Sequence, residues 1–142
     1  MIKNRVRCFA DSNSAYGALI CMNIVITGST TWHNKERIAE VLREFPSTTH
    51  IITGDTAGVD EHAALVASEL GLKCTRMKKI KEDYAKFPQA AWKGLNERML
   101  ALDIHLVLAF HPEFGMDGYA RGTVHAVDLA KQRGIKVIVI RS

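Results

Sequence analysis

Three short turns carry the glycines and hydroxyl side chains that could hold an anion. They span residues 28–32, 54–60 and 115–123. Glycine lets a backbone approach a phosphate closely, and Ser and Thr hydroxyls add hydrogen-bond donors. A single turn of this kind is commonly a plain chain reversal. Three of them at one edge of a sheet would form an anion-binding crevice. The elements that precede the turns determine whether they lie at the same edge.

Each of these turns follows a short apolar run that is typical of a buried strand. Such runs occupy residues 22–27, 50–53 and 106–110, and further strands are predicted at 73–77 and 137–140. Helical spacing of apolar residues predicts helices from a cap at Asn34 to Pro46, over 60–70 before Gly71, over 90–102, and over 122–133 before Gly134. This alternation predicts an α/β protein with a Rossmann-like, doubly wound, mainly parallel sheet and helices on both faces.

Length and composition fit one globular domain with a full core. The chain has 142 residues, of which 47% are hydrophobic and 24% charged. The α/β pattern begins at Met22, so we expect a domain over 22–142 and a leader over 1–21 whose role is open. The leader is either an appended strand or arm, or sequence upstream of a natural start at Met22.

The location expected from the sequence is the cytoplasm. No apolar run approaches the roughly 18 residues of a membrane span, and polar residues interrupt any secretory signal near the N-terminus. The three cysteines, Cys8, Cys21 and Cys74, are an odd number without metal-type spacing. They are typical of a reduced protein with ordinary thiols. Because no apolar run is long enough to span a membrane, we expect no membrane partner.

The net charge of +4 is concentrated in one segment. Residues 73–98 have a net charge of +5, and the rest of the chain sums to −1. This segment is either a solvated surface between two elements or a surface that faces phosphates. Tyr84 and Phe87 lie within it, either as anchors of a charged loop or as stacking platforms for bases.

Two familiar nucleotide motifs are absent from the sequence. There is no G-x-x-x-x-G-K-[ST], and the turn after the first strand is not G-x-G-x-x-G. Walker-type hydrolysis and dinucleotide redox chemistry are therefore disfavoured. The histidines His33, His62, His111 and His125 are scattered without zinc-type spacing, so we expect neither a metal nor a resident cofactor.

Five short motifs, in this order, resemble those of the SLOG superfamily. They are I-T-G-S-x-x-W at 26–32, T-G-D-x-x-G-V-D at 53–60, N-x-x-M at 96–99, hydrophobic-A-F at 108–110 and R-G-T at 121–123. The pattern is most similar to the YspA/YpsA-related branch, which is related to the SMF/DprA proteins and the LOG phosphoribohydrolases. The resemblance covers about 22–140 and implies a Rossmann-like domain whose glycine turns bind a nucleotide or a nucleotide derivative.

The turns and the motifs together nominate a set of ligand-binding residues. These are Gly28, Ser29, Thr30, Trp32, Gly54, Asp55, Gly58, Asp60, Asn96, Arg121, Gly122 and Thr123.

Three positions depart from the family pattern. Leu95 and Ala57 stand where many members have an arginine, so two phosphate contacts are missing. Ala126 stands where the LOG enzymes have the glutamate that assists cleavage of the N-glycosidic bond. This departure puts LOG-type hydrolysis in doubt. Whether the protein is an enzyme is left open, with Asp60 and Glu97 as the candidate catalytic residues.

Several nominated side chains also have an ordinary structural interpretation. Asp60 has a structural interpretation as a cap of the helix N-terminus. Its functional interpretation is to accept hydrogen bonds from a ribose hydroxyl or to act as a general base. Trp32 either packs in the core or stacks on a base. Arg98 forms either a surface salt bridge or a phosphate contact, and Arg121 is the stronger phosphate candidate.

Three functions follow from these observations. The first is binding of a phosphoribosyl-containing small molecule at the strand ends, as a sensor or as part of a processing system. The alternative is hydrolysis or transfer at the N-glycosidic bond of a nucleotide. The second alternative is DprA-like binding of single-stranded nucleic acid. That function would use Lys78, Lys79, Lys81, Lys86 and Lys93. By analogy with the family, the expected oligomer is a homodimer.

Overall fold

The computed structural model describes residues 22–142. The predicted leader, with Cys8 and Cys21, lies outside the described residues. The strands are β1 (Asn23–Gly28), β2 (His50–Thr53), β3 (Lys73–Arg76), β4 (Leu106–Phe110) and β5 (Lys136–Ile140). The helices are α1 (Lys35–Leu42), α2 (Val59–Leu70), α3 (Lys81–Lys86), α4 (Ala91–Leu100) and α5 (Arg121–Gln132).

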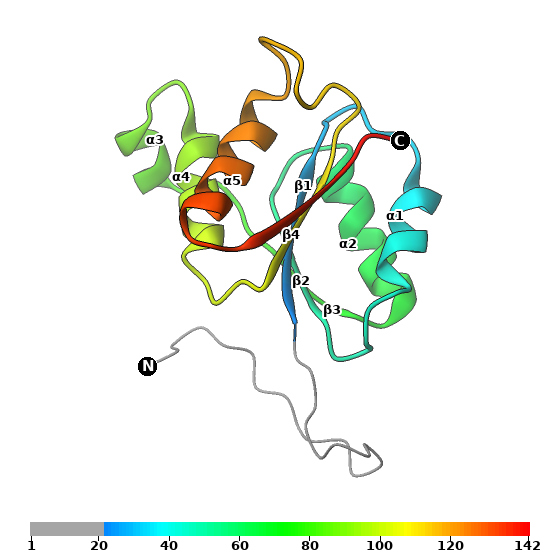
Figure 1. Ribbon diagram of the computed structural model, residues 1–142. Helices are drawn as coiled ribbons and strands as arrows, with labels where there is room; N and C mark the ends of the chain where they lie inside the picture. Colours follow the sequence, from blue (N-terminus) through cyan, green and yellow to red (C-terminus); the bar gives the residue numbers. More distant parts are fainter. Residues whose placement is uncertain (1–21) are drawn as a thin grey trace.

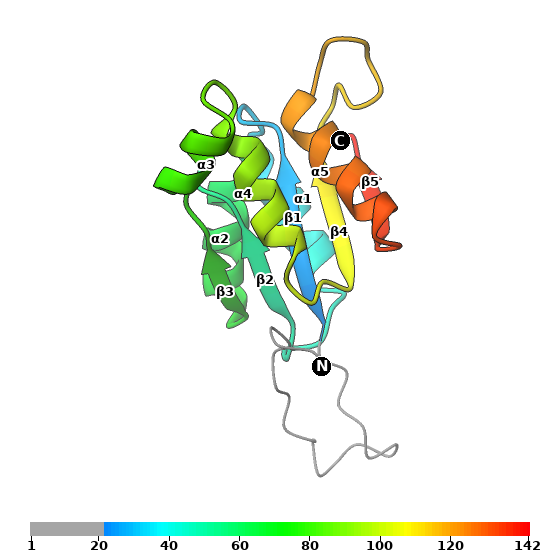
Figure 2. The ribbon, with the colours of Figure 1, turned by 90° about the vertical axis from the view of Figure 1, so that its left-hand side faces the viewer.

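The five strands form one parallel sheet in the order β3-β2-β1-β4-β5. Helices α1 and α2 pack together on one face, and α4 and α5 cover the other (Figures 1 and 2). The predicted α/β, Rossmann-like, doubly wound fold is therefore confirmed. Strands β2 and β3 are added on one side of β1, and β4 and β5 on the other, so the order of strands reverses between β1 and β4. Folds of this kind bind ligands outside the carboxyl ends of the strands at such a reversal.

The two faces of the central strands build two separate parts of the core. On the α1 and α2 side, Ile24 and Ile26 of β1 are fully buried in one cluster. On the α4 and α5 side, Val25 of the same strand packs in a second cluster with Leu95 and Met99 of α4. Strand residues alternate between faces, and both faces of β1 are apolar because helices cover both.

The predicted helix ends agree with the structure within a few residues. Asn34 caps α1, since its side chain accepts a hydrogen bond from the Arg37 amide over 3.1 Å. Gly71 ends α2 in the left-handed conformation, with φ of 72°. Helix α1 is shorter than predicted and ends at Leu42, because the chain continues towards Pro46 with tighter i to i−3 bonds at Glu44 and Phe45.

Helix α3 is an element that the sequence reading missed. The segment was expected to be a charged surface or loop, but Lys81–Lys86 is helical. Its first turn is held by Asp83, whose carboxylate accepts a hydrogen bond from the Ile80 amide over 2.9 Å. The capping carboxylate lies three residues after the cap position, where it satisfies a free amide of the helix start.

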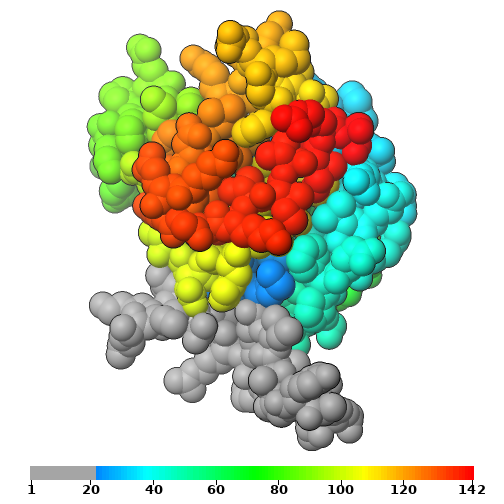
Figure 3. All heavy atoms as spheres, in the orientation of Figure 1, coloured from blue at the N-terminus to red at the C-terminus, as the bar shows by residue number. Residues whose placement is uncertain are grey.

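The two outer strands are more exposed than the central ones, although helices lie on both faces of the sheet as predicted. Most of β3 is exposed, and β5 alternates exposed and half-buried residues, with Ile138 38% exposed. Figure 3 shows β5 at the surface beside α1. The apolar run of β5 suggested a central strand, yet only one neighbour, β4, pairs with it.

No helix within residues 22–142 is long and apolar enough to cross a lipid bilayer.

Candidate functional site

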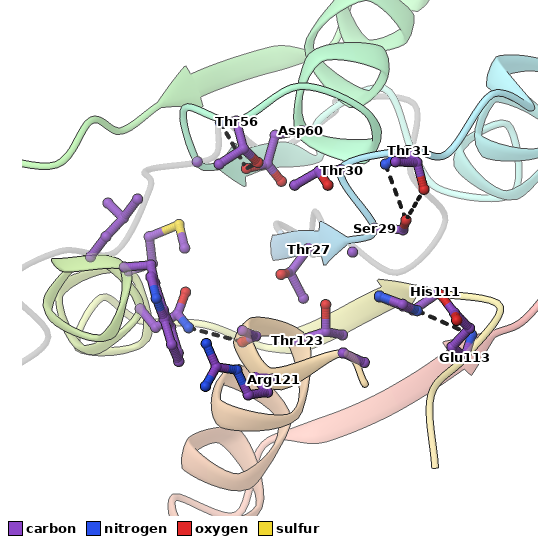
Figure 4. A pocket seen from close by; sticks show the side chains of 18 of the residues that line it. Thr27, Ser29, Thr30, Thr31, Thr56, Asp60, His111, Glu113, Arg121 and Thr123 are labelled. Atoms are coloured by element: carbon purple, nitrogen blue, oxygen red, sulfur yellow. Dashed lines mark hydrogen bonds between the residues drawn. The ribbon is translucent and has the colours of Figure 1, made fainter. Parts of the chain in front are cut away.

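A cavity of about 510 Å³ opens at the carboxyl ends of β1, β2 and β4 (Figure 4). Its size is in the range of small-molecule sites. The walls come from the turns after these three strands, from Lys79, and from helices α2, α4 and α5. The lining residues are Thr27, Gly28, Ser29, Thr30, Thr31, Gly54, Thr56, Asp60, Lys79, Trp92, Leu95, Asn96, Met99, His111, Glu113, Ala120, Arg121, Gly122 and Thr123.

The structure brings most of the predicted ligand-binding residues to this cavity. Those that line it are Gly28, Ser29, Thr30, Gly54, Asp60, Asn96, Arg121, Gly122 and Thr123. Four nominated residues do not line it. They are Trp32, Asp55, Gly58 and Glu97.

Trp32 is a core residue rather than a stacking platform. Its side chain is 7% exposed and meets the Phe110 ring edge-on, with the ring centroids 5.6 Å apart. The indole N–H donates to the Asn34 carbonyl over 2.8 Å. The packing interpretation therefore replaces the stacking one, because a ligand in the cavity does not meet this ring.

Asp55 and Glu97 do not line the cavity, and each is engaged in an ion pair. The Asp55 carboxylate lies 2.6 Å from the Lys79 ammonium, and Glu97 lies 2.7 Å from Lys86. Glu97 is therefore poorly placed for the catalytic role proposed for it, which leaves Asp60 as the candidate carboxylate at the cavity.

Two of the turn glycines allow close packing of the turns themselves. A Cβ on Gly28 would lie 2.1 Å from the Phe110 carbonyl oxygen. Gly58 has φ of 75°, and a Cβ there would lie 2.3 Å from the Ser29 carbonyl oxygen. Gly28 thus lets the turn after β1 lie against the end of β4. Gly58 lets the turn after β2 reach the turn after β1.

The turn after β1 is organised by hydroxyl groups. Ser29 Oγ accepts a hydrogen bond from the Thr31 amide over 3.1 Å and lies 3.0 Å from Thr31 Oγ1. The Ser29 amide donates to the Phe110 carbonyl over 2.9 Å. Figure 4 shows Ser29 and Thr31 at one side of the cavity, across from Arg121 and Thr123.

Asp60 presents a buried carboxylate to the cavity from the first turn of α2. It is 8% exposed, and its Oδ1 accepts a hydrogen bond from the Thr53 hydroxyl over 3.1 Å. Its Oδ2 accepts from the Thr56 hydroxyl over 2.8 Å and from the Thr56 amide over 3.3 Å. Burial raises the pKa of Asp60, and these hydrogen bonds oppose the rise because they favour the ionised form.

The N-terminus of α5 offers hydrogen-bond donors at the opposite side. Its first helical bond runs from the Val124 amide to the Ala120 carbonyl over 2.7 Å. The amides of Arg121, Gly122 and Thr123 precede that bond and have no carbonyl partner within the helix. Ala120 takes a left-handed conformation, with φ of 59°, where the loop enters the helix. These donors, together with the helix dipole, favour an anion.

Arg121 adds a full positive charge beside those amides. It is exposed, lines the cavity, and within residues 22–142 its guanidinium has no ion-pair partner. Lys79, by contrast, lines the cavity while paired with Asp55. Arg121 is therefore the lining cation whose charge is available to a ligand.

Asn96 fastens α4 to the start of α5. Its amide nitrogen donates to the Gly122 carbonyl over 3.1 Å and lies 3.1 Å from His125 Nδ1. Burial is the main cause that lowers the pKa of His125, so its imidazole is neutral at pH 7. These contacts fix the position of the α5 first turn relative to α4.

His111 is a cavity residue that was interpreted from the sequence as structural. Burial lowers its pKa, so the ring is neutral at pH 7. Its Nδ1 accepts a hydrogen bond from the Glu113 amide over 3.1 Å, which leaves the ring proton on Nε2. His111 directly follows β4, and its place after a strand end, like that of Gly28, was the available signal.

Other cavity residues were also missed by sequence reasoning. Thr31 and Thr56 belong to nominated turns, and Trp92 stands three residues before Leu95 on the predicted third helix. That spacing was the available signal for Trp92, because residues three apart share a helix face. Lys79 was nominated for nucleic-acid binding, but no sequence signal placed it at this cavity, since its position depends on the path of the chain after β3.

Three of the eight basic side chains in the basic segment 73–98 are paired with carboxylates. Arg98 forms a two-point pair with Asp83, with contacts of 3.0 and 2.5 Å, and donates to the Lys78 carbonyl over 2.7 Å. The salt-bridge interpretation of Arg98 therefore holds. Of the five lysines considered for nucleic acid, Lys79 and Lys86 are already paired with carboxylates.

Within residues 22–142, no group of three or more His, Cys, Asp or Glu side chains is arranged to hold a metal ion.

Comparison with known proteins finds similarity to solved structures but none at the level of sequence families or curated proteins. No family model matches the sequence, and no curated protein matches it either. Among solved structures, the chain is similar to DNA processing protein A (DprA) from Streptococcus pneumoniae, with 14% identity and a TM-score of 0.49. The match covers 84% of this chain and 59% of that one, so the chain spans less than two thirds of the length of its neighbour.

Proposed function

We propose that the cavity binds a nucleotide or another phosphoribosyl-containing molecule, and that the protein acts as a sensor of this ligand or in its processing. One observation carries the proposal. The free amides of Arg121, Gly122 and Thr123 and the unpaired Arg121 charge meet at a cavity at the strand ends. This function agrees with the motif resemblance to the SLOG superfamily, whose YspA/YpsA-related branch is the one we propose.

The two sides of the cavity suit the two polar parts of such a ligand. At the α5 side, a phosphate would receive charge-assisted hydrogen bonds from the backbone amides and from Arg121. At the α2 side, the Asp60 carboxylate would accept a hydrogen bond from a sugar hydroxyl at Oδ1, which accepts from Thr53 alone, whereas Oδ2 already accepts two bonds from Thr56. The hydroxyls of Ser29 and Thr31 lie on the remaining polar wall.

Isothermal titration calorimetry with a panel of ligands tests this function. The panel holds AMP, ADP, ADP-ribose and cyclic AMP, with adenosine as the matched ligand without phosphate. We expect saturable binding of at least one phosphate-bearing ligand and binding of adenosine that is at least tenfold weaker. A folded protein that binds none of the panel, or that binds adenosine as well as AMP, contradicts the proposal.

A second function, cleavage at the N-glycosidic bond of a nucleotide, is favoured by Asp60 alone. It is a buried carboxylate at the cavity with a raised pKa, as a general acid or base requires. Incubation with nucleoside monophosphates, followed by chromatography for the free base, tests this function. Base release that is lost in Asp60→Asn supports it, whereas nucleotide binding without release supports a sensor.

Single-stranded nucleic-acid binding has less support, because two of its five candidate lysines are in ion pairs. It predicts binding to single-stranded DNA that weakens steeply with salt and with charge reversal at Lys78 and Lys81. A cytoplasmic location and a homodimer stay predictions from the sequence and the family analogy.

A further inference from the structure

We infer that Trp92 is the stacking platform for the nucleobase, so that the site takes ligands that combine a planar aromatic ring with a phosphate rather than sugar phosphates alone. This inference rests on the proposed function and names the part of the ligand that the α4 wall recognises.

One face of α4 forms the apolar wall of the cavity. Trp92, Leu95, Asn96 and Met99 all line it and follow the i, i+3, i+4, i+7 spacing of a single helix face. Leu95 and Met99 are at most 4% exposed, whereas Trp92 in the first turn is half-buried. Trp92 is therefore the large apolar side chain of this wall with surface left for a ligand to cover.

The Trp92 ring is held in place on its other sides. It meets the His125 ring edge-on, with centroids 5.6 Å apart and planes at 85°. The Lys93 ammonium lies 5.6 Å from the Trp92 centroid. His125 is itself anchored by Asn96. A ring fixed by its neighbours stacks on a ligand with little loss of side-chain entropy.

The ring also lies beside the proposed phosphate position. A Cβ built on Gly122 would be 3.8 Å from Trp92 Cε3, with no other atom within 4 Å. The aromatic wall and the free amides of the α5 first turn are therefore adjacent. A nucleotide, in which ribose joins base and phosphate, can reach both at once.

The opposite wall differs in chemistry from the α4 wall. Ser29, Thr31 and Thr56 present hydroxyls there, and Asp60 presents a carboxylate. A sugar phosphate would satisfy that wall and leave the α4 wall facing water. A molecule with an aromatic ring also covers Trp92, and burial of that apolar surface is favourable.

Calorimetric titration of AMP and of ribose 5-phosphate into three proteins tests the inference. The proteins are wild type, Trp92→Ala and Trp92→Phe, with folding checked by circular dichroism. Stacking of a base on an aromatic residue has a free-energy value that corresponds to about a 5- to 150-fold change in affinity. We expect Trp92→Ala to weaken AMP binding by that factor, to change ribose 5-phosphate binding by less than about threefold, and Trp92→Phe to retain most of the AMP affinity.

Fluorescence gives a readout that a merely structural role of Trp92 would not change. The chain has two tryptophans, and Trp32 is buried away from the cavity. We expect AMP, but not ribose 5-phosphate, to quench wild-type emission, and Trp92→Phe to lose this quenching while it still binds AMP.

The outcomes separate this inference from the proposed function. If wild type binds AMP and ribose 5-phosphate equally well and Trp92→Ala binds both unchanged, the stacking role is wrong and the phosphate site stands. If Trp92→Ala loses both ligands to the same extent, Trp92 shapes the site without stacking, and the inference is overturned. If wild type binds neither ligand, the inference is overturned, and the proposed function fails with it when no other phosphate-bearing ligand of the calorimetric panel binds.

Discussion

The Thr56 hydroxyl donates a 2.8 Å hydrogen bond to Asp60 Oδ2, and the Thr56 amide donates to the same oxygen over 3.3 Å. The turn after β2 is thereby tied to the first turn of α2. Burial raises the pKa of the carboxylate that could meet a sugar, and these hydrogen bonds oppose that rise because they favour its ionised form. Thr56 and Asp60 therefore line the candidate site and also stabilise the fold.

We predict that Thr56→Val lowers the free energy of unfolding by about 1–2 kcal/mol at pH 7, because a hydrogen bond to a buried charged group is lost without a change of shape. This loss of unfolding free energy is present at pH values above the pKa of Asp60 in the folded protein, which burial raises. The loss decreases as the pH falls below that pKa, since the carboxyl is then protonated. Thr56→Ser keeps the hydroxyl and is the control. Urea denaturation at pH 7 and pH 4 measures both, and equal effects of Val and Ser contradict the account.

A second prediction separates two glycines of the cavity. In Gly28→Ala the new Cβ would lie 2.1 Å from the Phe110 carbonyl oxygen, so we expect a loss of several kcal/mol or failure to fold. In Gly122→Ala the nearest atom is 3.8 Å away, and alanine is the better helix former, so stability should stay within about 1 kcal/mol of wild type.

The same Gly122→Ala change should weaken AMP binding by about tenfold, because the added methyl stands beside the free amides of the α5 first turn. Thermal unfolding together with calorimetry measures stability and affinity in the same samples. Unchanged affinity in a folded Gly122→Ala protein would argue against close backbone contact with the ligand.

Replacing Arg121 tests the source of anion affinity. Arg121→Ala removes an unpaired charge at the cavity, and a charge-assisted hydrogen bond contributes about 1.5–3 kcal/mol. We therefore expect AMP binding to weaken at least tenfold, with a smaller salt dependence, while binding of adenosine is unaltered. Arg133→Ala, at the C-cap of the same helix and outside the cavity lining, is the matched control. Equal effects of the two substitutions contradict the assignment.

The pair between Arg98 and Asp83 predicts a pH-dependent stability. Asp83 is 3% exposed, and its hydrogen bonds with Arg98 lower its pKa. Arg98→Met leaves this carboxylate buried and unpaired, which we expect to cost about 2–3 kcal/mol at pH 7 after allowance for the partial exposure of Arg98.

The pKa of Asp83 is lower in the folded protein than in the unfolded chain, where it is about 3.9. Its contribution to stability is therefore present above about pH 3.9, the unfolded pKa, and is lost as the pH falls through the lower pKa of the folded state. The stability difference between wild type and Arg98→Met should therefore shrink below about pH 4. Lys35→Met, which breaks the exposed pair with Glu69, should cost less than about 1 kcal/mol and serves as the control. Guanidinium denaturation from pH 7 to below about pH 4 measures the stability of the three proteins, and a difference for Arg98→Met that does not shrink with falling pH contradicts the prediction.

The fold could be predicted because local signals agreed with its topology. The apolar runs of β1, β2 and β4, the Asn34 cap and the Gly71 stop each specify an element by short-range chemistry. Helix α3 was missed because its stabilising partner, Arg98, lies fifteen residues beyond Asp83. The exposure of Ile138 was missed because an apolar run alone does not distinguish a central strand from an edge strand.

The candidate site was predictable where a residue directly follows a strand or opens a helix, as at Gly54 and Gly122. It was not predictable where three-dimensional packing determines which of two tryptophans reaches the cavity. Trp32 carries the motif, yet it packs on Phe110, while Trp92 reaches the cavity through the orientation of α4. That orientation depends on long-range contacts such as the one between Asn96 and Gly122.

Proton–nitrogen correlation spectra of the labelled protein, titrated with AMP and with adenosine, test the central claim most directly, since they locate the ligand on the backbone. The account predicts saturable shifts with AMP that are largest at the amides of Arg121, Gly122 and Thr123 and in the turn that holds Ser29, with much smaller shifts at the three α5 amides when adenosine is used. No saturable shift at millimolar AMP, or shifts that centre away from the carboxyl edge of the sheet, would contradict it.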